Sequence, residues 1–188
     1  MPTFVTDRTQ ADVNRWKTLA AKGWGGMTAA EREEWMNSPK GAYNASDFNR
    51  VGAAMNEIVS IFATQRGALA DYLAGLGVAE DESFTVPYNP ATLNWTQKDD
   101  WPRGVKLSRE ELAQYLSRVK LLRSCFDSDA PQPPDSMLGL KFDGANAIEE
   151  ALRGTLITGT RWYSTTRAAA LRTSQAWYYS GDLYAGEV

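Results

Sequence analysis

The sequence predicts a mainly α protein, an elongated helical bundle with long loops and a short C-terminal β-hairpin. Three observations carry this prediction: apolar residues recur in steps of three and four, capping signals precede these stretches, and glycine- and proline-rich segments separate them. The 188 residues suit one domain, or one domain with appendages. We expect an N-terminal helical region with a long aromatic loop (1–126), a proline connector with C-terminal helices (127–176) and an aromatic attachment element (177–188).

The segment Ser46–Gly77 is the helix on which the others are expected to pack. Ser46 can cap its first turn, and Gly75 and Gly77 supply the stop. At about 1.5 Å per residue it would be roughly 45 Å long. The spacing fits either the core of a monomeric bundle or a seam shared between protomers. The apolar positions are Phe48, Val51, Met55, Ile58, Phe62, Leu69, Tyr72 and Leu76.

Two shorter helices are expected before this segment. Thr9 opens the first, with Asp12 placed to complete its cap, and Gly23 ends it at the start of a glycine-rich turn. Thr28 and Glu31 form a capping box for the second helix. The side chains that this second helix is expected to turn inward are Trp35 and Met36.

A long region without helical periodicity follows, from residue 78 to residue 107. Phe84–Val86 is a candidate short strand. Because loops of this length are usually functional or packed against a neighbour, we expect Trp95 and Trp101 to pin the loop. The surface that they contact is either the helices of the same chain or another subunit.

The next helix begins at a capping box of Ser108 and Glu111 and continues to Phe126. Cys125, near its end, is interpreted as a small buried hydrophobic residue and not as a nucleophile. A proline-rich connector over residues 127–137 then redirects the chain.

Two further helices and a hairpin are expected at the end of the chain. Asp143 starts a helix whose end is weakened by Gly154 and Gly159, and a second helix is expected over residues 160–176. Residues 177–188 contain alternating aromatics around a Ser-Gly-Asp turn, which indicates two short strands. Since a lone hairpin is unstable in water, it is interpreted as an attachment element, with a fold-back onto the bundle as the alternative.

Composition excludes several classes of function. The chain has no histidine, one cysteine and a net charge of −3. No imidazole ligand or base is therefore available, no internal disulfide can form, and a dedicated nucleic-acid binder is not expected. We expect no metal, cofactor, membrane span or signal segment. The carboxylate pairs, such as Asp99 with Asp100 and Glu149 with Glu150, fit solvated or capping roles, so no enzyme is predicted.

Tryptophan and tyrosine are more abundant than a small core needs, with seven and eight copies respectively. These are the residues that anchor protein interfaces. The candidate interaction residues are Trp95, Trp101, Trp162, Trp177, Tyr178, Tyr179, Leu183 and Tyr184.

Several motifs in order resemble those of a known family. They are TDRTQADV (6–13), KGW (22–24), MTAAEREEW (27–35), KGAYNASDFNRVGAAMNEI (40–58), NWTQKDDWP (94–102), ELAQYLSRVKLLR (111–123), PPDSMLGLKFDGANAIEEAL (133–152) and SGDLYAGE (180–187). Together they resemble small structural proteins encoded in the tail modules of tailed bacteriophages and prophages, especially those of gut Firmicutes. The segment 155–173 does not follow the family pattern.

The resemblance implies a virion component of the tail, at the baseplate or tail tip, with no catalytic residues. It implies other tail proteins as partners, a homo-oligomer in the particle, and a location in the virion after assembly in the host cytoplasm. Two alternatives are a small phage-encoded regulator that binds a host protein and a carboxylate-based cell-wall hydrolase.

Overall fold

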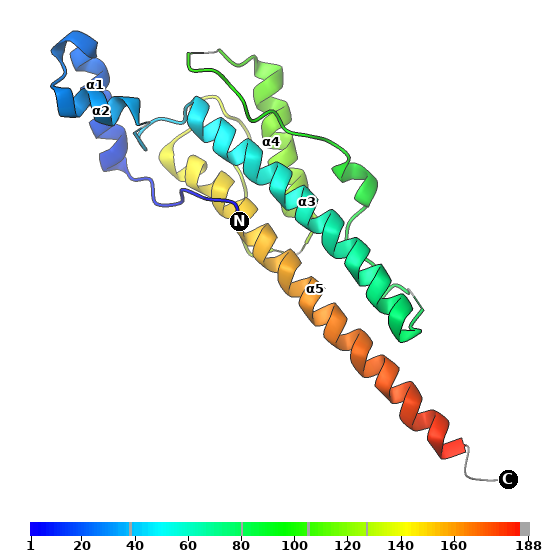
Figure 1. Cartoon of the computed structure of the whole chain (residues 1–188). Helices are drawn as coiled ribbons and strands as arrows, with labels where there is room; N and C mark the ends of the chain where they lie inside the picture. Colours follow the sequence, from blue (N-terminus) through cyan, green and yellow to red (C-terminus); the bar gives the residue numbers. More distant parts are fainter. Residues whose placement is uncertain (38, 80, 105, 127, 185–188) are drawn as a thin grey trace.

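The protein is mainly helical, as a computed structural model of the chain shows (Figure 1). The structure describes residues 1–37, 39–79, 81–104, 106–126 and 128–184, with side chains described as far as Gln175. In chain order the helices are α1 (Gln10–Gly26), α2 (Ala29–Met36), α3 (Ala45–Leu76), the short 3₁₀ helix η1 (Pro90–Leu93), α4 (Arg109–Ser124) and α5 (Phe142–Tyr184).

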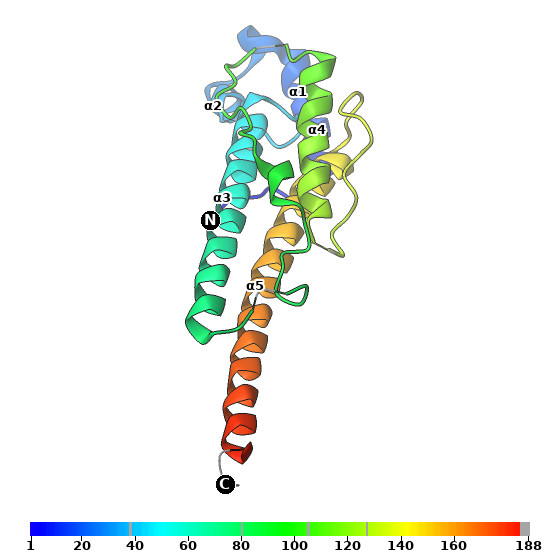
Figure 2. The ribbon, with the colours of Figure 1, turned by 90° about the vertical axis from the view of Figure 1, so that its right-hand side faces the viewer.

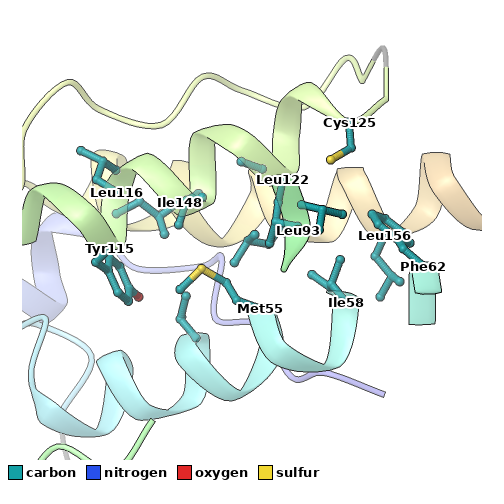
Figure 3. Close-up of a cluster of buried hydrophobic side chains, with 14 of the residues drawn as sticks. Met55, Ile58, Phe62, Leu93, Tyr115, Leu116, Leu122, Cys125, Ile148 and Leu156 are labelled. Carbon is teal, nitrogen blue, oxygen red and sulfur yellow. The ribbon is translucent and has the colours of Figure 1, made fainter. Parts of the chain in front are cut away.

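The body of the molecule is a three-helix bundle in which α5 packs against both α3 and α4. Its core is a continuous apolar cluster in which Met55, Ile58, Leu122, Ile148 and Leu152 are fully buried (Figure 3). The apolar positions predicted for Ser46–Gly77 lie in this core or in a smaller core beyond it, so α3 is confirmed as a core helix. The expectation that the other helices pack on it was wrong in one respect, because the helix that packs against both of the others is α5. The apolar seam of α3 was expected to lie either in the core of a monomeric bundle or between protomers. In the described part of the chain, its side chains pack inside the chain.

α5 is much longer than its neighbours, and its second half runs past the end of α3 in both views of the ribbon (Figures 1 and 2). A second, smaller core lies near the end of α3, where α5 extends past it. In this core Leu69, Leu73 and Phe84 pack with Ala170 of α5. Beyond Ala170 the backbone of α5 continues as a helix to Tyr184. The molecule is therefore a bundle with a projecting helical end.

Capping explains where most helices begin. Predicted capping boxes open α1, α2 and α4: in each, a hydroxyl accepts the N–H three residues on, and that residue's carboxylate accepts the N–H of the cap. The pairs are Thr9 with Asp12, Thr28 with Glu31, and Ser108 with Glu111. For α3 the prediction of Ser46 as the cap was wrong. Asn44 takes this place, with Asp47 as its partner, which puts Ser46 inside the first turn.

The first two helices differ from expectation in detail. The regular helix of α1 is broken at Gly23, as predicted, because φ +60° and ψ 166° at that residue are not helical, and a short helical stretch follows the kink to Gly26. Trp35 is half-buried and stacks on Trp16 with ring centroids 6.1 Å apart, as expected of an inward residue. Met36 was predicted to face inward but is 49% exposed at the end of α2.

The two helices expected after the proline connector are one helix, α5. Gly154 and Gly159 do not weaken it, because both lie where another segment approaches closely. A β-carbon on Gly154 would lie 2.4 Å from Cβ of Ala130, and one on Gly159 would lie 2.6 Å from the ring of Phe62. The glycines therefore serve packing and not helix termination.

No strand is present in the described part of the chain, and the strand expected at Phe84–Val86 is a turn and bend that buries Phe84. The predicted hairpin over residues 177–188 falls where α5 continues as helical backbone to Tyr184 and where residues 185–188 lie outside the described part. Strand pairing at this end stays a prediction. None of the described helices is apolar over enough of its length to cross a bilayer.

Candidate interaction surface

The long loop before α4 is bound to α3 by two asparagines two helical turns apart. The side chain of Asn56 accepts the Gln97 N–H at 2.7 Å and donates to the Gln97 carbonyl at 2.9 Å. Asn49 makes the same pair with Trp101, at 2.6 and 3.0 Å. Each amide therefore satisfies both backbone groups of one loop residue, as a neighbouring strand would.

Gly52 lies between these asparagines on the same face of α3, and it lets the loop approach. A β-carbon at this position would lie 2.7 Å from the Lys98 carbonyl oxygen. At the 3.6-residue period, residues 49, 52 and 56 share one stripe of the helix. We name this stripe, together with loop residues 97–101, the asparagine ladder.

The two tryptophans of this loop are half-buried and face their own chain. Trp95 lies against the guanidinium of Arg118, 4.8 Å from its ring centroid, and its indole N–H donates to the Thr92 carbonyl. Trp101 lies beneath the Lys98 ammonium group at 4.4 Å. Both tryptophans pack against the core of the same chain. Contact of their exposed parts with another subunit stays a prediction.

Trp162 occupies the junction between the main and the second core. Its ring lies 6.0 Å from that of Phe126, which in turn packs against Phe62 at 5.0 Å. Trp162 is half-buried, so part of its surface stays open beside α5. The other candidate interaction residues, Trp177, Tyr178, Tyr179, Leu183 and Tyr184, belong to the end of α5, where no side chain is described.

A buried ion cluster, which sequence reasoning missed, binds the N-terminal arm to the bundle. Nη2 of Arg8 lies 2.8 Å from an Asp47 carboxylate oxygen and 2.7 Å from one of Glu149. Arg50 contacts the same two oxygens at 2.8 and 2.6 Å. The Glu149 side chain is fully buried and that of Arg8 is 2% exposed. Two cations therefore neutralise two anions at the meeting point of the arm, α3 and α5.

Further hydrogen bonds hold the arm at this cluster. Glu149 also accepts the backbone N–H of Val5, and Asn146 accepts the Arg8 N–H at 3.1 Å while donating to the Arg8 carbonyl at 2.9 Å. Although burial opposes it, the carboxylates of Glu149 and Asp47 raise the pKa of Arg50 above its ordinary value. All four charged side chains are thus engaged in structural contacts.

Beside the cluster, a tyrosine pair closes the end of the core. The hydroxyl groups of Tyr43 and Tyr115 are 2.7 Å apart, and burial raises the pKa of both. On the other side of Tyr43 a cleft of about 470 Å³ lies between α1 and the start of α5. Its lining includes Lys17, Lys40 and Lys141, and Lys40 is paired with Asp7.

Other chemistry is limited in the described part of the chain. It contains no group of three or more carboxylate and thiol side chains placed to hold a metal ion. The Cys125 side chain is buried, and burial raises the pKa of its thiol to about 11, which opposes formation of the nucleophilic thiolate. The interpretation of Cys125 as a quiet core residue agrees with this environment.

Comparison with known proteins supplies no further identification. No protein family, curated protein or solved structure was found to match the chain.

Proposed function

We propose that this chain is a structural component of a tailed-bacteriophage virion, at the tail, baseplate or tail tip. In this role it joins subunits and attaches fibres or adaptors. Its partners are other tail proteins and, within the particle, further copies of the same chain. It acts in the virion after assembly in the host cytoplasm. The resemblance of its ordered motifs to tail-module proteins is the first support for this proposal.

The projecting end of α5 is the observation that carries the proposal. Among the side chains described, which end at Gln175, Ala170 is the last of α5 that is buried against α3, and the helical backbone continues for fourteen more residues to Tyr184, or roughly 21 Å. An isolated helix of this length is marginal in water unless it packs against something. Its sequence includes Trp177, Tyr178 and Tyr179, residue types that favour interfaces. A neighbouring subunit is the expected support.

The environment of the acidic groups supports a structural role over a catalytic one. Glu149, a member of one of the candidate carboxylate pairs, is buried and bonded to two arginines and a backbone N–H. A general acid or base needs access to a substrate proton, and this carboxylate has none in the folded chain. We therefore propose no catalytic residue.

A second role, as a regulator that binds a host protein, draws on the α1–α2 hairpin. These two helices pack on each other and project from the end of the bundle (Figure 1). Trp24 and Met36 are 54% and 49% exposed on them. Large exposed residues of this kind would suit a transient contact.

Composition of purified particles separates these two roles. We would induce a bacterium that carries the gene, purify particles on a density gradient and quantify the chain by mass spectrometry. The tail role predicts a constant ratio to other tail proteins in every particle fraction. Recovery only in the soluble fraction, bound to a single host protein, would support the regulator instead.

A further inference from the structure

The outer face of α5, turned away from α3 and α4, combines exposed apolar and basic side chains. At 100° per residue, the exposed positions between residues 153 and 172 that fall within an arc about 100° wide are Ser164 and six apolar or basic residues. We name them the outer row: Arg153, Ile157, Arg161, Ala168, Leu171 and Arg172. All six are exposed, and Ile157 and Leu171 are large apolar residues with 50% and 41% of their surface open. Scattered exposure of single apolar residues is common, but here they share a stripe with three arginines.

The charge of this part of the chain is one-sided. Between Ala151 and Gly181 there are four arginines and no aspartate, glutamate or lysine, although the whole chain has a net charge of −3. Arg153 pairs with Glu150, one turn away. Among the described residues, the guanidinium groups of Arg161 and Arg172 have no carboxylate partner. Within the described part of the chain, two of the three arginines of the outer row thus carry a charge that no carboxylate neutralises, on a protein that is acidic overall.

The fourth arginine of this segment, Arg167, lies outside the outer row and has partners within the chain. The guanidinium of Arg167 turns toward α3 and lies 4.3 Å from the ring centroid of Tyr72 and 5.6 Å from that of Tyr163. Its charge is held in cation–π contacts within the chain. Arg161 and Arg172, in contrast, face outward on either side of Ala168, about 16 Å apart along the helix.

We propose that the outer row binds an acidic amphipathic helix of a different protein. This rests on the proposed function, because it assigns the chemistry of one partner in the assembly. A helix with an apolar stripe would cover Ile157, Ala168 and Leu171, and flanking glutamates or aspartates would face Arg161 and Arg172. From Arg153 to Arg172 the row is about 28 Å long, which matches a partner helix of about 20 residues.

Charge decides against the two other occupants. A second copy lying parallel would place each arginine of the row opposite its own counterpart, and such like-charge contacts are costly at an interface. Nucleic acid would match the arginines, but its phosphates would not cover the apolar centre of the row. The partner that satisfies both the apolar and the basic positions is an acidic helix.

Binding of a designed peptide tests this surface. The probe is a fluorescein-labelled 21-residue helical peptide with leucine at its a and d positions and glutamate beside them, titrated with the full chain in an anisotropy assay. We expect binding that weakens as salt is raised, because the flanking contacts are ionic. In the double variant Arg161→Glu/Arg172→Glu the affinity should fall by about tenfold or more. The double variant Lys106→Glu/Arg109→Glu, which makes the same charge change at exposed positions near α4, should bind as the parent does.

Two further probes check the apolar half and the competing occupants. Replacing the leucines of the peptide by serine should abolish binding if Ile157 and Leu171 contribute. Equal binding by both charge variants, retention by the serine peptide, or tighter binding of a 20-base-pair DNA duplex would overturn the proposal. Self-association of the parent chain that Arg161→Glu/Arg172→Glu abolishes would also overturn it.

Incorporation into particles separates this inference from the function on which it rests. If the parent chain enters particles and Arg161→Glu/Arg172→Glu enters equally well, the outer row is not the attachment surface, while the tail role stands. If the parent chain is absent from particles, the tail role fails even where the peptide binds.

Discussion

Asn56 and Gln97, 41 residues apart, exchange two hydrogen bonds that pair a side-chain amide with both backbone groups of a loop residue. Asn49 repeats this arrangement with Trp101, and Asn146 repeats it with Arg8 in the N-terminal arm. Three asparagines on helices thus hold three residues of extended segments. Because the backbone groups of these segments need partners when they leave water, the asparagines replace the strands that this fold lacks in its described part.

The first prediction concerns this pairing. Asn56→Ala removes both hydrogen bonds and leaves the backbone N–H and carbonyl of Gln97, a residue that is 5% exposed, without these partners. We expect the free energy of unfolding to fall by about 1–3 kcal/mol, measured by urea denaturation. Hydrogen exchange at the Gln97 amide should accelerate in the same variant. Asn14→Ala, at an exposed asparagine of α1, is the control and should change stability by less than about 0.5 kcal/mol.

The second prediction concerns the glycines of the long helices. Gly159→Ala should destabilise the protein, by about 1–3 kcal/mol, because its methyl group would press on the rings of Phe62 and Phe126. Gly67→Ala, in α3, has nothing within 4 Å of the new methyl group and should stabilise by about 0.5–1 kcal/mol. Thermal unfolding of the two variants measures both effects. Stabilisation by Gly159→Ala would show that α5 does not approach these rings.

The third prediction concerns the buried ion cluster. Glu149→Gln leaves Arg8 and Arg50 to share Asp47 in a buried site, and we expect a loss of about 3–5 kcal/mol in the free energy of unfolding. Glu150→Gln is the matched control, because its carboxylate pairs with Arg153 at the surface and contributes less than about 1 kcal/mol. Similar effects of the two substitutions would contradict the burial of Glu149.

The fourth prediction concerns acid sensitivity of the α1–α2 hairpin. The hydrogen bond from Lys22, with that from the Thr28 N–H, lowers the pKa of Glu31 to about 2. A glutamate in the unfolded chain titrates near 4.3, so the stabilisation is complete above that pH and is lost as the pH falls through about 2. The carbon chemical shift of the Glu31 carboxyl should titrate accordingly.

A variant isolates this effect from other carboxylates. At pH 6, Glu31→Gln should have a lower melting temperature than the parent chain. Between pH 5 and pH 2, the melting temperature of the variant should fall by less than that of the parent chain. Parallel loss in the two proteins would mean that Lys22 and Thr28 do not hold the ionised Glu31 in the folded hairpin.

Much of the helical architecture was predictable because its causes are local. Apolar spacing placed α3 and α4, and the capping boxes of Thr9, Thr28 and Ser108 marked three helix starts. The division of α5 into two helices was wrong. It was predicted because Gly154 and Gly159 lower the local helix propensity, but these glycines serve close packing against Ala130 and Phe62, which are distant in sequence.

The buried ion cluster and the asparagine ladder were not predictable for the same reason. Arg8 and Glu149 are 141 residues apart, and each resembles a solvated surface charge in its own segment. One signal was present: Glu149 directly follows Ile148, at the edge of the apolar stripe of α5. Among the candidate interaction residues, the type of residue indicated that Trp95 and Trp101 anchor the loop. It could not show whether they contact the helices of the same chain or another subunit.

Density for α5 in assembled particles tests the central claim most directly. A cryo-electron-microscopy map of the purified tail, at a resolution that separates helices, would show whether another polypeptide contacts the projecting end of α5. The account predicts that another polypeptide contacts α5 beyond Ala170 and along the outer row. A map in which the projecting end of α5 is surrounded by solvent would contradict this claim. Particles that lack the chain altogether would contradict it as well.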